Sequence, residues 1–263
     1  MVGGQFGEID TSKMKSNDPS DFLECLNWNE AFTKSVGYEN DDIISYYSNQ
    51  FGHDKPWLQR RTHSTLEDLA LSERQANLFF GFALAVVKLK KQNIRVLDIG
   101  GGNGYMAYWL RDFFPELSFE WIILESKSVA ESYNTWKDAA QISWIHKDAF
   151  NATYDIILVS CALQYIENWS RLLVDSVNNC QILLLMRLSI LENDQHKFGV
   201  HKIFRKSING EFDASVPCHF FAANEIYNQI STKMTPIYQL IYDHESVIFD
   251  DEEVKFQDLF FQK

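Results

Sequence analysis

The stretch from Arg95 to Leu110 holds an acid and four glycines at a spacing that suits ligand binding. It reads Arg-Val-Leu-Asp-Ile-Gly-Gly-Gly-Asn-Gly-Tyr-Met-Ala-Tyr-Trp-Leu, so Asp98 precedes Gly100, Gly101, Gly102 and Gly104. A strand-like apolar run comes before the loop, and a helical pattern of apolar residues follows it at once. Glycines in such a turn let a ligand approach backbone amides at a helix N-terminus. The stretch therefore predicts a binding site for a small molecule.

Two further acids follow the next two apolar runs. Glu125 comes directly after Phe119–Leu124, 21 residues past Gly104, and Asp148 follows Ile142–Ile145. A carboxylate in the first position can accept hydrogen bonds from both hydroxyls of a ribose. Ligands of open α/β sheets bind outside the carboxyl ends of the strands, where all three acids fall. We also expect the neighbouring residues Ser126, Ala149 and Ser160 to contact a cofactor. For Asp148, a turn or helix-capping role is the alternative.

The spacing Asp98-x-Gly100-x-Gly102-x-Gly104 resembles motif I of the class I S-adenosylmethionine (SAM) methyltransferases. This resemblance implies SAM as cofactor and S-adenosylhomocysteine (SAH) as product. Asp98 would then lie near the amino-acid end of the cofactor, Glu125 on the ribose and Asp148 by the adenine. The segment from Gly102 to Ala107 also fits the dinucleotide pattern G-x-G-x-x-A, so a dinucleotide-dependent oxidoreductase is an alternative. A catalytically silent methyltransferase fold that acts as a binding protein is another.

Scattered motifs resemble, more narrowly, a family of methyltransferases found among bacterial genes for surface polysaccharides. They are Asn27-Trp-Asn-Glu-Ala31, Gly37-Tyr38, Val96-Leu-Asp-Ile-Gly-Gly, Leu163-Gln-Tyr-Ile166 and Pro217-Cys-His-Phe-Phe221. The similarity is thin, spans about residues 27 to 245, and implies a small-molecule or glycan-precursor acceptor. The chain has Met186-Arg187-Leu-Ser where the family has an Asp-Arg-Thr-Pro run, so only Arg187 carries over. His201 and His219 stand where the family tends to have Gln and Trp, so their roles are not inherited.

The residues after the fourth strand are candidates for the methyl-transfer step. Transfer from SAM is an in-line displacement, in which the enzyme positions the nucleophile and removes its proton if it has one. Many small-molecule O-methyltransferases have a histidine base here, whereas this chain has Gln164. An amide can orient a nucleophile but cannot take its proton. Tyr165 is a possible partner, although an aromatic side chain at this point equally suits plain packing.

Arginines near the expected site mouth favour an acidic acceptor. The segment Phe51–Ser64 is interpreted as a substrate lid that supplies Trp57, Arg60 and Arg61, with a solvated loop as the alternative; Arg187 would reach the site from the fifth strand. Arginine grips phosphate or carboxylate oxygens with paired hydrogen bonds. An anionic oxygen, as in a phosphate, phosphoramidate or carboxylate, needs no general base. The alternative is a neutral sugar hydroxyl that loses its proton to His201 or His219.

The alternation of apolar runs and helical patterns predicts an α/β fold with a doubly wound, mostly parallel sheet of seven strands, Rossmann-like, behind an N-terminal helical cap. Residues 1–20 are expected to be a flexible lead-in, 21–91 the helical cap and lid, and 92–263 the SAM-binding domain with an insertion at about 188–217. Strands are predicted at 119–124, 142–145, 155–160, 181–186, 236–242 and 245–249 besides the one before Asp98. The last two strands flank residues 243–244 and resemble the C-terminal antiparallel pair of class I methyltransferases, and residues 250–253 are expected to be a solvated end. Helices are predicted at 72–91, 104–114, 128–139, 168–177 and 222–230, with short ones from Asp21 to Val36.

Bulk composition limits the partners of the chain. It has 263 residues and a formal net charge of -12, and no cluster of Lys and Arg suits a nucleic-acid backbone. Four widely spaced cysteines indicate reduced thiols and a cytoplasmic protein. No signal peptide or membrane-length apolar run is visible. No metal-ligand pattern is visible either, so we expect no metal site. A homo-oligomer is compatible with this composition.

Overall fold

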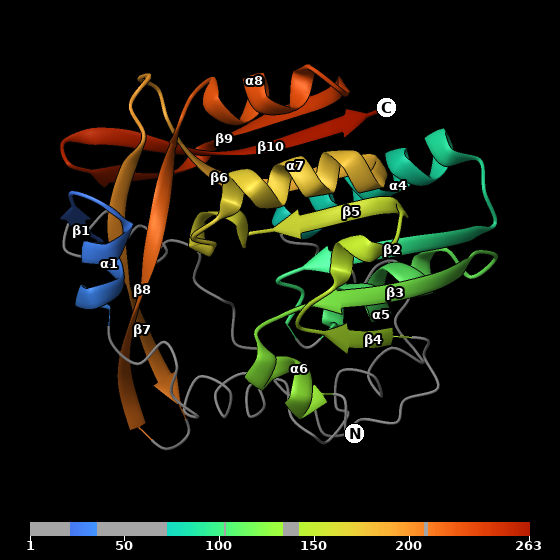
Figure 1. The fold of residues 1–263 in the computed structure, drawn as a ribbon, viewed down its shortest axis with the longest axis horizontal. Coiled ribbons are helices and arrows are strands. Elements are labelled where there is room, and N and C mark those ends of the chain that lie inside the picture. The colour runs from blue at the N-terminus through green and yellow to red at the C-terminus, as the bar shows by residue number, and fades with distance from the viewer. Residues whose placement is uncertain (1–21, 36–72, 103, 134–141, 208–209) are drawn as a thin grey trace, which may run out of the picture.

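The computed structural model describes residues 22–35, 73–102, 104–133, 142–207 and 210–263 (Figure 1). Five strands at its centre run parallel in the order β4-β3-β2-β5-β6. They are β2 (Asn93–Ile99), β3 (Ser118–Leu124), β4 (Ile142–Ile145), β5 (Tyr154–Ser160) and β6 (Cys180–Leu191). All seven residues of β5 are buried, as its continuous apolar character predicted for a strand covered on both faces.

An antiparallel pair completes the expected seven-stranded sheet. β10 (Glu252–Gln262) lies between β6 and β9 (Thr235–Phe249) and runs opposite to both. The sequence predicted this pair but placed its turn at residues 243–244 and took residues 250–253 for a solvated end. Both details are wrong, because β9 continues to Phe249 and the chain reverses at Asp250 and Asp251. These two residues have φ values of 50° and 60°, as in the tight turns that suit hairpin twist.

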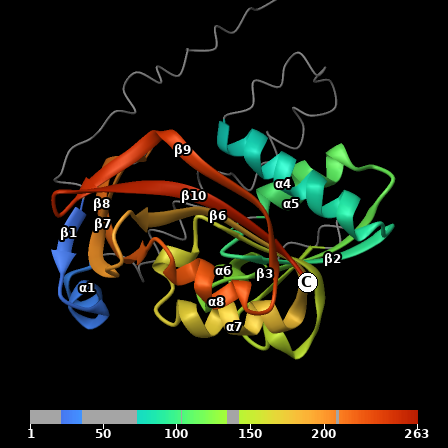
Figure 2. The ribbon, with the colours of Figure 1, turned by 90° about the horizontal axis from the view of Figure 1, so that it is seen from above.

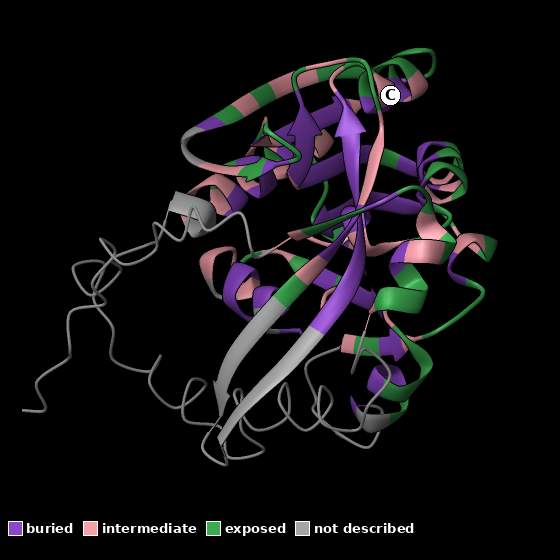
Figure 3. Ribbon diagram, turned by 90° about the vertical axis from the view of Figure 1, so that its left-hand side faces the viewer, coloured by how far each residue is buried: buried purple, intermediate pink, exposed green. Residues whose placement is uncertain are grey.

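Helices cover both faces of the sheet, as Figure 2 shows from above. One face carries α4 (Glu73–Leu89), α5 (Tyr105–Phe113) and α6 (Lys127–Tyr133), and the other carries α7 (Trp169–Asn179) and α8 (Glu225–Ser231). Only the short 3₁₀ turn η5 (Ala149–Asn151) connects β4 to β5, as the short gap in the sequence predicted. The helices thus confirm the doubly wound arrangement, and Figure 3 shows the buried residues concentrated along the strands between them.

Helix α4 packs directly on the sheet. A Cβ atom at Gly81 would lie 2.5 Å from Cζ of Phe260 on β10, so only a glycine fits this contact. One residue on, the ring of Phe82 stacks on Trp121 of β3 at a centroid distance of 5.4 Å. The helix therefore belongs to the layer that covers the sheet. It delivers the chain into β2, as predicted.

A second group of elements extends the sheet beyond the seven expected strands. β7 (Lys197–Ser207) and β8 (Gly210–Ala222) form a long antiparallel hairpin, and β1 (Phe22–Cys25) pairs with β7. Helix α1 (Trp28–Lys34) packs against this hairpin. β8 joins the main sheet only where it runs beside Ile190 and Leu191 of β6. Figure 1 shows the hairpin standing across the side to which the arrows of β3, β4 and β5 point.

This extension corrects two predictions. Residues 22–25 form a strand and not a helix, since a strand so short gains backbone partners from β7, whereas an isolated turn of helix is costly to nucleate. The described part of the chain contains ten strands in place of seven. The predicted insertion at 188–217 is largely β-strand, with β6 reaching Leu191. The division at residues 21 and 92 stays a prediction, and residues 1–20 lie outside the described residues.

Candidate functional site

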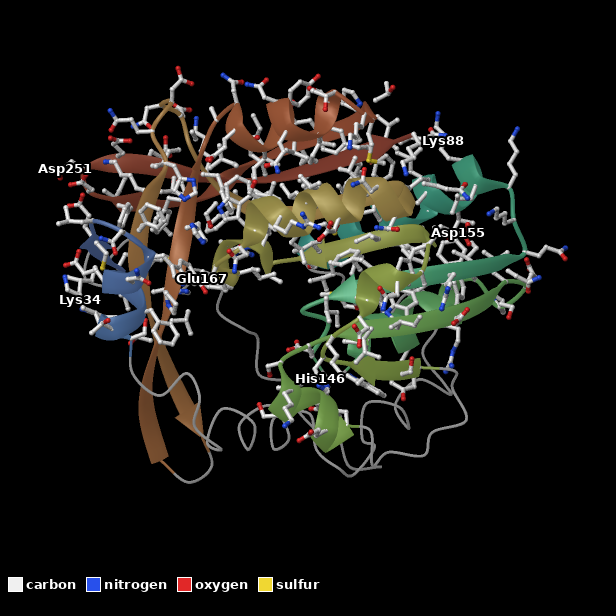
Figure 4. All side chains as sticks on the ribbon, viewed as in Figure 1. Lys34, Lys88, His146, Asp155, Glu167 and Asp251 are labelled. Carbon is white, nitrogen blue, oxygen red and sulfur yellow. The ribbon has the colours of Figure 1, made fainter. Side chains whose placement is uncertain are left out.

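The three predicted acids lie at the ends of parallel strands on the same side of the sheet: Asp98 within the last two residues of β2, Glu125 directly after β3, and Asp148 three residues past β4. Figure 4 marks this edge with His146, just past β4, and Glu167, which follows the segment after β5. Asp155 at the start of β5 and Lys88 at the end of α4 mark the opposite edge. The carboxyl edge faces the β7–β8 hairpin, so residues of the hairpin can meet residues of the strand ends.

The glycine loop between β2 and α5 brings bare backbone beside Asp98. A Cβ atom at Gly101 would lie 2.5 Å from Oδ2 of Asp98, so a side chain cannot fit there. Gly102 has a φ of 56°, in the left-handed region that favours glycine, and a Cβ there would meet nothing within 4 Å. Gly100 and Gly104 also have positive φ values, 72° and 75°. The loop thus leaves open space against its backbone at Gly102.

Glu125 lies directly after β3 and fixes this loop. Its Oε1 accepts a hydrogen bond from the Gly102 amide at 3.0 Å, and its Oε2 accepts one from the Ser126 amide at 2.9 Å. Burial raises the pKa of Glu125, while these two amide bonds act in the opposite direction. A carboxylate offers about four lone-pair sites. Glu125 therefore retains acceptor capacity, and its contact with the two hydroxyls of a ribose stays a prediction.

Asp98 is a buried carboxyl group with one unpaired oxygen. Its Oδ2 accepts a hydrogen bond from Trp121 Nε1 at 3.3 Å, whereas its Oδ1 has no hydrogen-bond partner. Burial raises the pKa of Asp98 to about 7, with the Trp121 bond opposing and the Glu125 charge reinforcing that rise. An unpaired buried acceptor calls for a ligand or a water. The ammonium group of an amino-acid moiety would satisfy it.

Asp148 lies at the end of the β4 segment with its side chain exposed to solvent. Its backbone has a φ of 60°, and its carbonyl accepts from Asn151 N at 3.2 Å to form η5. The side chain makes no capping hydrogen bond, so helix capping does not occupy the carboxylate. Ala149 and Ser160 are buried beside these strand ends. The adenine-facing role of Asp148 stays a prediction.

The segment after β5 abuts the glycine loop. A Cβ at Gly100 would lie 2.5 Å from Cβ of Ala162, which immediately precedes the 3₁₀ turn η6 (Leu163–Tyr165). Gln164 in this turn is 4% exposed, and its Oε1 has no hydrogen-bond partner. Cys161 has a φ of 55°, a strained value for a cysteine. The predicted acceptor side of the site therefore contains a second unpaired buried oxygen.

Tyr165 and His201 meet between η6 and the hairpin. The Tyr165 Oη and His201 Nδ1 atoms are 3.0 Å apart, and the two rings are nearly parallel at 13°. Phe22 of β1 stacks on His201 with a centroid distance of 4.7 Å. Both Tyr165 and His201 are partly exposed. The structure thus brings together two residues that the sequence named separately.

His219 occupies a closed environment on β8. It is 2% exposed, and Trp28 stacks on its ring at 4.3 Å. Its Nδ1 lies 2.9 Å from His196 Nε2, and His196 Nδ1 donates to Glu225 Oε2 at 2.7 Å. Burial, then the neighbouring His196, lowers the pKa of His219 to about 3, with the Ile166 backbone acting in the opposite direction. His219 is therefore neutral at ordinary pH.

Arg187 lies in β6 with its backbone in the left-handed region, at a φ of 56°. Its amide donates to Oδ1 of the buried Asp258 at 2.7 Å, where the pairing of β10 with β6 shifts register. Its guanidinium lies 4.6 Å from the ring centroid of Phe256. The predicted contact of Arg187 with an acceptor stays a prediction. Trp57, Arg60 and Arg61, the predicted lid residues, lie outside the described residues.

Four residues of this region were missed by sequence reasoning. Trp121 and Trp144 hold the site, since Trp144 Nε1 donates to the Gly102 carbonyl at 2.8 Å. His196 and Glu225 form the chain behind His219. The two tryptophans could have been found from the sequence, because Trp121 lies in the strand before Glu125 and Trp144 lies in the strand before Asp148. No sequence pattern indicates the contact between His196 and Glu225, since these residues meet only when the hairpin forms.

The remaining expectations concern metals, thiols and membranes. In the described ranges no group of three or more His, Cys, Asp or Glu side chains could hold a metal ion. That catalysis needs no metal stays a prediction. None of the four cysteines, all within those ranges, forms a disulfide. None of the helices described is both long and apolar enough to span a bilayer.

Comparison with known proteins places the fold. No protein-family model and no curated protein matches the chain. Among solved structures, it is similar to the CcbJ methyltransferase from Streptomyces caelestis, with a TM-score of 0.50 and 10% identity over 70% of this chain and 88% of that one. It is also similar to a SAM-dependent methyltransferase from Clostridium acetobutylicum ATCC 824 (TM-score 0.48, 10% identity, 83% and 98% covered). At such identities likeness shows the fold alone, and the chain has the Rossmann-like α/β fold of the Streptomyces methyltransferase.

Proposed function

We propose that the chain is a SAM-dependent methyltransferase. The observation that carries this proposal is the group of acceptors at the carboxyl edge: the unpaired oxygen of Asp98 and the carboxylate of Glu125 beside open space at Gly102. These groups fit the ammonium, the ribose and the backbone-facing part of SAM. When bound, SAM supplies a methyl group activated by a positive sulfur. The chain itself has to hold the cofactor, orient the acceptor and exclude water.

Each cofactor contact has a proposed residue. Asp98 binds the ammonium group, Glu125 binds both ribose hydroxyls, and Ser126 lies beside the ribose. Asp148 and Ala149 face the adenine. Ser160 and the glycine loop border the centre of the cofactor. These roles rest on position at the strand ends.

The strand order favours this proposal over the oxidoreductase alternative. Dinucleotide-binding sheets commonly have the parallel order 3-2-1-4-5-6. Here the reversed strand β10 separates β6 from β9, giving β4-β3-β2-β5-β6-β10-β9. The sequence predicted such an antiparallel C-terminal pair from its resemblance to class I methyltransferases.

We infer that the chain transfers the methyl group to an oxygen atom of a small or sugar-linked acceptor. The acceptor would belong to bacterial surface-polysaccharide biosynthesis, and the reaction would take place in the cytoplasm. Support comes from the family resemblance of residues 27 to 245 and from a net charge of -12, which disfavours nucleic acid. One version is an anionic acceptor, such as a phosphate or phosphoramidate, held by Arg187. The other is a neutral hydroxyl, which requires a proton acceptor. The contact between Tyr165 and His201 favours the hydroxyl.

Thermal unfolding with a panel of cofactors tests the proposal. SAM or SAH at about 100 times its dissociation constant should stabilise the folded chain by about 2.7 kcal/mol. NADH and NADPH should leave the melting temperature unchanged. Stabilisation by a nicotinamide cofactor and not by SAM or SAH would establish the oxidoreductase instead. Binding of SAM without methyl transfer to any acceptor tried would favour a silent binding protein.

A further inference from the structure

We propose that Tyr165 and His201 form the proton-accepting pair of the site, with Tyr165 in contact with the acceptor hydroxyl and His201 behind it as the positioning residue. This inference rests on the proposed methyl transfer and names the groups that would activate the nucleophile. It also decides between the two histidines that the sequence left open. Tyr165 lies beside the glycine loop and contacts His201, whereas His219 is enclosed.

Tyr165 lies where an acceptor has to approach the cofactor. Ala162 is in contact range of Gly100 in the glycine loop, and the Tyr165 amide donates to the Ala162 carbonyl at 2.9 Å. In a 3₁₀ turn, residues three apart stand one above the other. Tyr165 therefore stands one turn above the point where the β5 end touches the loop. The unpaired Oε1 of Gln164 next to it can accept a second hydroxyl of the acceptor.

The hairpin holds His201 in a fixed orientation towards Tyr165. Phe22 is the register partner of His201 across β1 and β7, and its ring lies against the imidazole at an angle of 17°. The distance of 3.0 Å from Tyr165 Oη to His201 Nδ1 is that of a hydrogen bond, in which the phenol donates. Both side chains are partly exposed, so a ligand can reach the pair.

His219 lacks these properties. Its ring is 2% exposed and lies beneath Trp28, and its Nδ1 is already engaged by His196. With a pKa of about 3, it does not retain a proton taken from a hydroxyl near neutral pH. The chain from Glu225 through His196 to His219 instead braces β8 against α8 and the start of β7.

The proton and electron transfers of the step balance. The acceptor O–H passes its proton to Tyr165 Oη while the phenol passes its own proton to His201 Nδ1, which leaves a neutral tyrosine and an imidazolium. The electron pair of the acceptor oxygen forms the bond to the methyl carbon. The electron pair of the broken carbon–sulfur bond stays on sulfur. One positive charge therefore moves from the sulfonium to His201.

Ionisable groups of the described residues lie near His201 on three elements. Tyr165 faces His201 from η6. Glu24 lies two residues along β1 from Phe22, the register partner of His201, and Cys218 lies two residues along β8 from its partner Val216. Burial raises the pKa of the Cys218 thiol, so Cys218 is uncharged. His201 has to be neutral before it can accept the proton of the phenol. Turnover should therefore fall as pH drops below about 6.5, the unperturbed histidine pKa.

Nitrogen-15 NMR of the histidine rings in the free protein tests the pair without cofactor or acceptor. In Tyr165→Phe the Nδ1 resonance of His201 should shift away from its wild-type position, because the hydrogen bond from the phenol is lost. Tyr227→Phe, on the outer face of α8, removes a phenol elsewhere and should leave this resonance unchanged. An Nδ1 resonance that is the same in Tyr165→Phe and in the wild type overturns the proposal.

Kinetics with a panel of nucleotide-activated sugars as acceptors tests the chemical role. Tyr165→Phe and His201→Ala should each lower kcat at least about 100-fold, with an unchanged KM for SAM. Added imidazole should restore part of the activity of His201→Ala. His219→Asn, measured at a temperature where it is folded, should keep kcat within about tenfold of the wild type. Full kcat in Tyr165→Phe, or loss of kcat in His219→Asn alone, contradicts the assignment.

The experiments distinguish an error in the assignment of the Tyr165–His201 pair from an error in the proposed function. If SAH does not bind the wild-type chain, methyl transfer is excluded whatever the NMR shows. If SAH binds equally to the wild type and Tyr165→Phe but the Nδ1 resonance does not respond, the cofactor site stands and the proton-accepting pair does not.

Discussion

Asp98 and His219 are buried ionisable residues with pKa shifts that affect stability in opposite directions. The pKa of Asp98 rises to about 7, and that of His219 falls to about 3. In both cases the main cause is burial, which disfavours the charged form. Each shift therefore becomes a dependence of the unfolding free energy on pH.

For Asp98, the folded cofactor-free chain retains a proton that the unfolded chain releases near its ordinary pKa of 3.8. The stability from this group is present below that value and is lost as pH rises through about 7. Asp98→Asn should remove this loss, so its urea unfolding free energy should fall less than that of the wild type between about pH 4 and pH 7. The exposed Asp194→Asn serves as the control. Equal pH dependence in Asp98→Asn and the wild type would refute the buried, raised-pKa state.

For His219, the folded chain holds the ring neutral while the unfolded chain protonates near pH 6.5. Stability from this group is present above that value and is lost as pH falls towards about 3. His219→Asn should lower stability at neutral pH by breaking the contact with His196, yet flatten the decline on acidification. Urea unfolding at several pH values measures both effects, with the exposed His146→Asn as the comparison. An undiminished acid decline in His219→Asn would count against this account.

Elements with a continuous apolar run or a clear helical period were predictable, and the strands of the β7–β8 hairpin were not. The strand at 142–145 and the helices α4, α5 and α7 lie within one or two residues of their predicted bounds. β7 and β8 mix apolar with polar and charged residues along their length, so neither has the continuous hydrophobic run of the parallel strands. The turn at Asp250 and Asp251 lacks the Asn-Gly or Asp-Gly signal that marks such hairpins.

A glycine should stabilise the turn at Asp250 and Asp251. Asp251 has a φ of 60°, which costs a residue with a Cβ atom, and Asp250 forms an ion pair with Lys197 at 2.5 Å. Asp251→Gly should therefore raise the unfolding free energy by up to about 1 kcal/mol, because glycine adopts this conformation without strain. Asp194→Gly, outside any such turn, should give no gain. Destabilisation by Asp251→Gly in urea unfolding would contradict the left-handed turn.

The contact of α4 with β10 gives the opposite expectation. Gly81→Ala places a methyl group 2.5 Å from the Phe260 ring. Overpacking of this kind costs about 1–3 kcal/mol. The helix preference of alanine over glycine offsets at most about 1 kcal/mol of this cost, so Gly81→Ala should lower the stability. Thermal unfolding should show the loss, while Val87→Ala, exposed on the same helix, should stay within about 0.5 kcal/mol. A gain in stability for Gly81→Ala would mean that the helix does not pack this closely.

At the scale of the molecule, the cofactor half of the site follows from the sequence and the acceptor half does not. Asp98, the glycines and Glu125 come together because strand, loop and helix are consecutive in the chain and neighbouring strands are parallel. Tyr165 and His201 are 36 residues apart and meet only through the hairpin. No local pattern predicts such a contact. The lid residues stay a prediction, as does a homo-oligomer.

Calorimetric titration of SAH into the wild type, Glu125→Ala and Glu131→Ala tests the central claim most directly. Glu131 is a carboxylate on α6 that is 61% exposed, so its removal should leave SAH affinity unchanged. Glu125→Ala removes two charged hydrogen bonds to the ribose, worth roughly 2–4 kcal/mol after partial compensation. Affinity should then fall roughly 30- to 700-fold. SAH binding to Glu125→Ala as tight as to the wild type would contradict the assignment of the carboxyl edge as the SAM site.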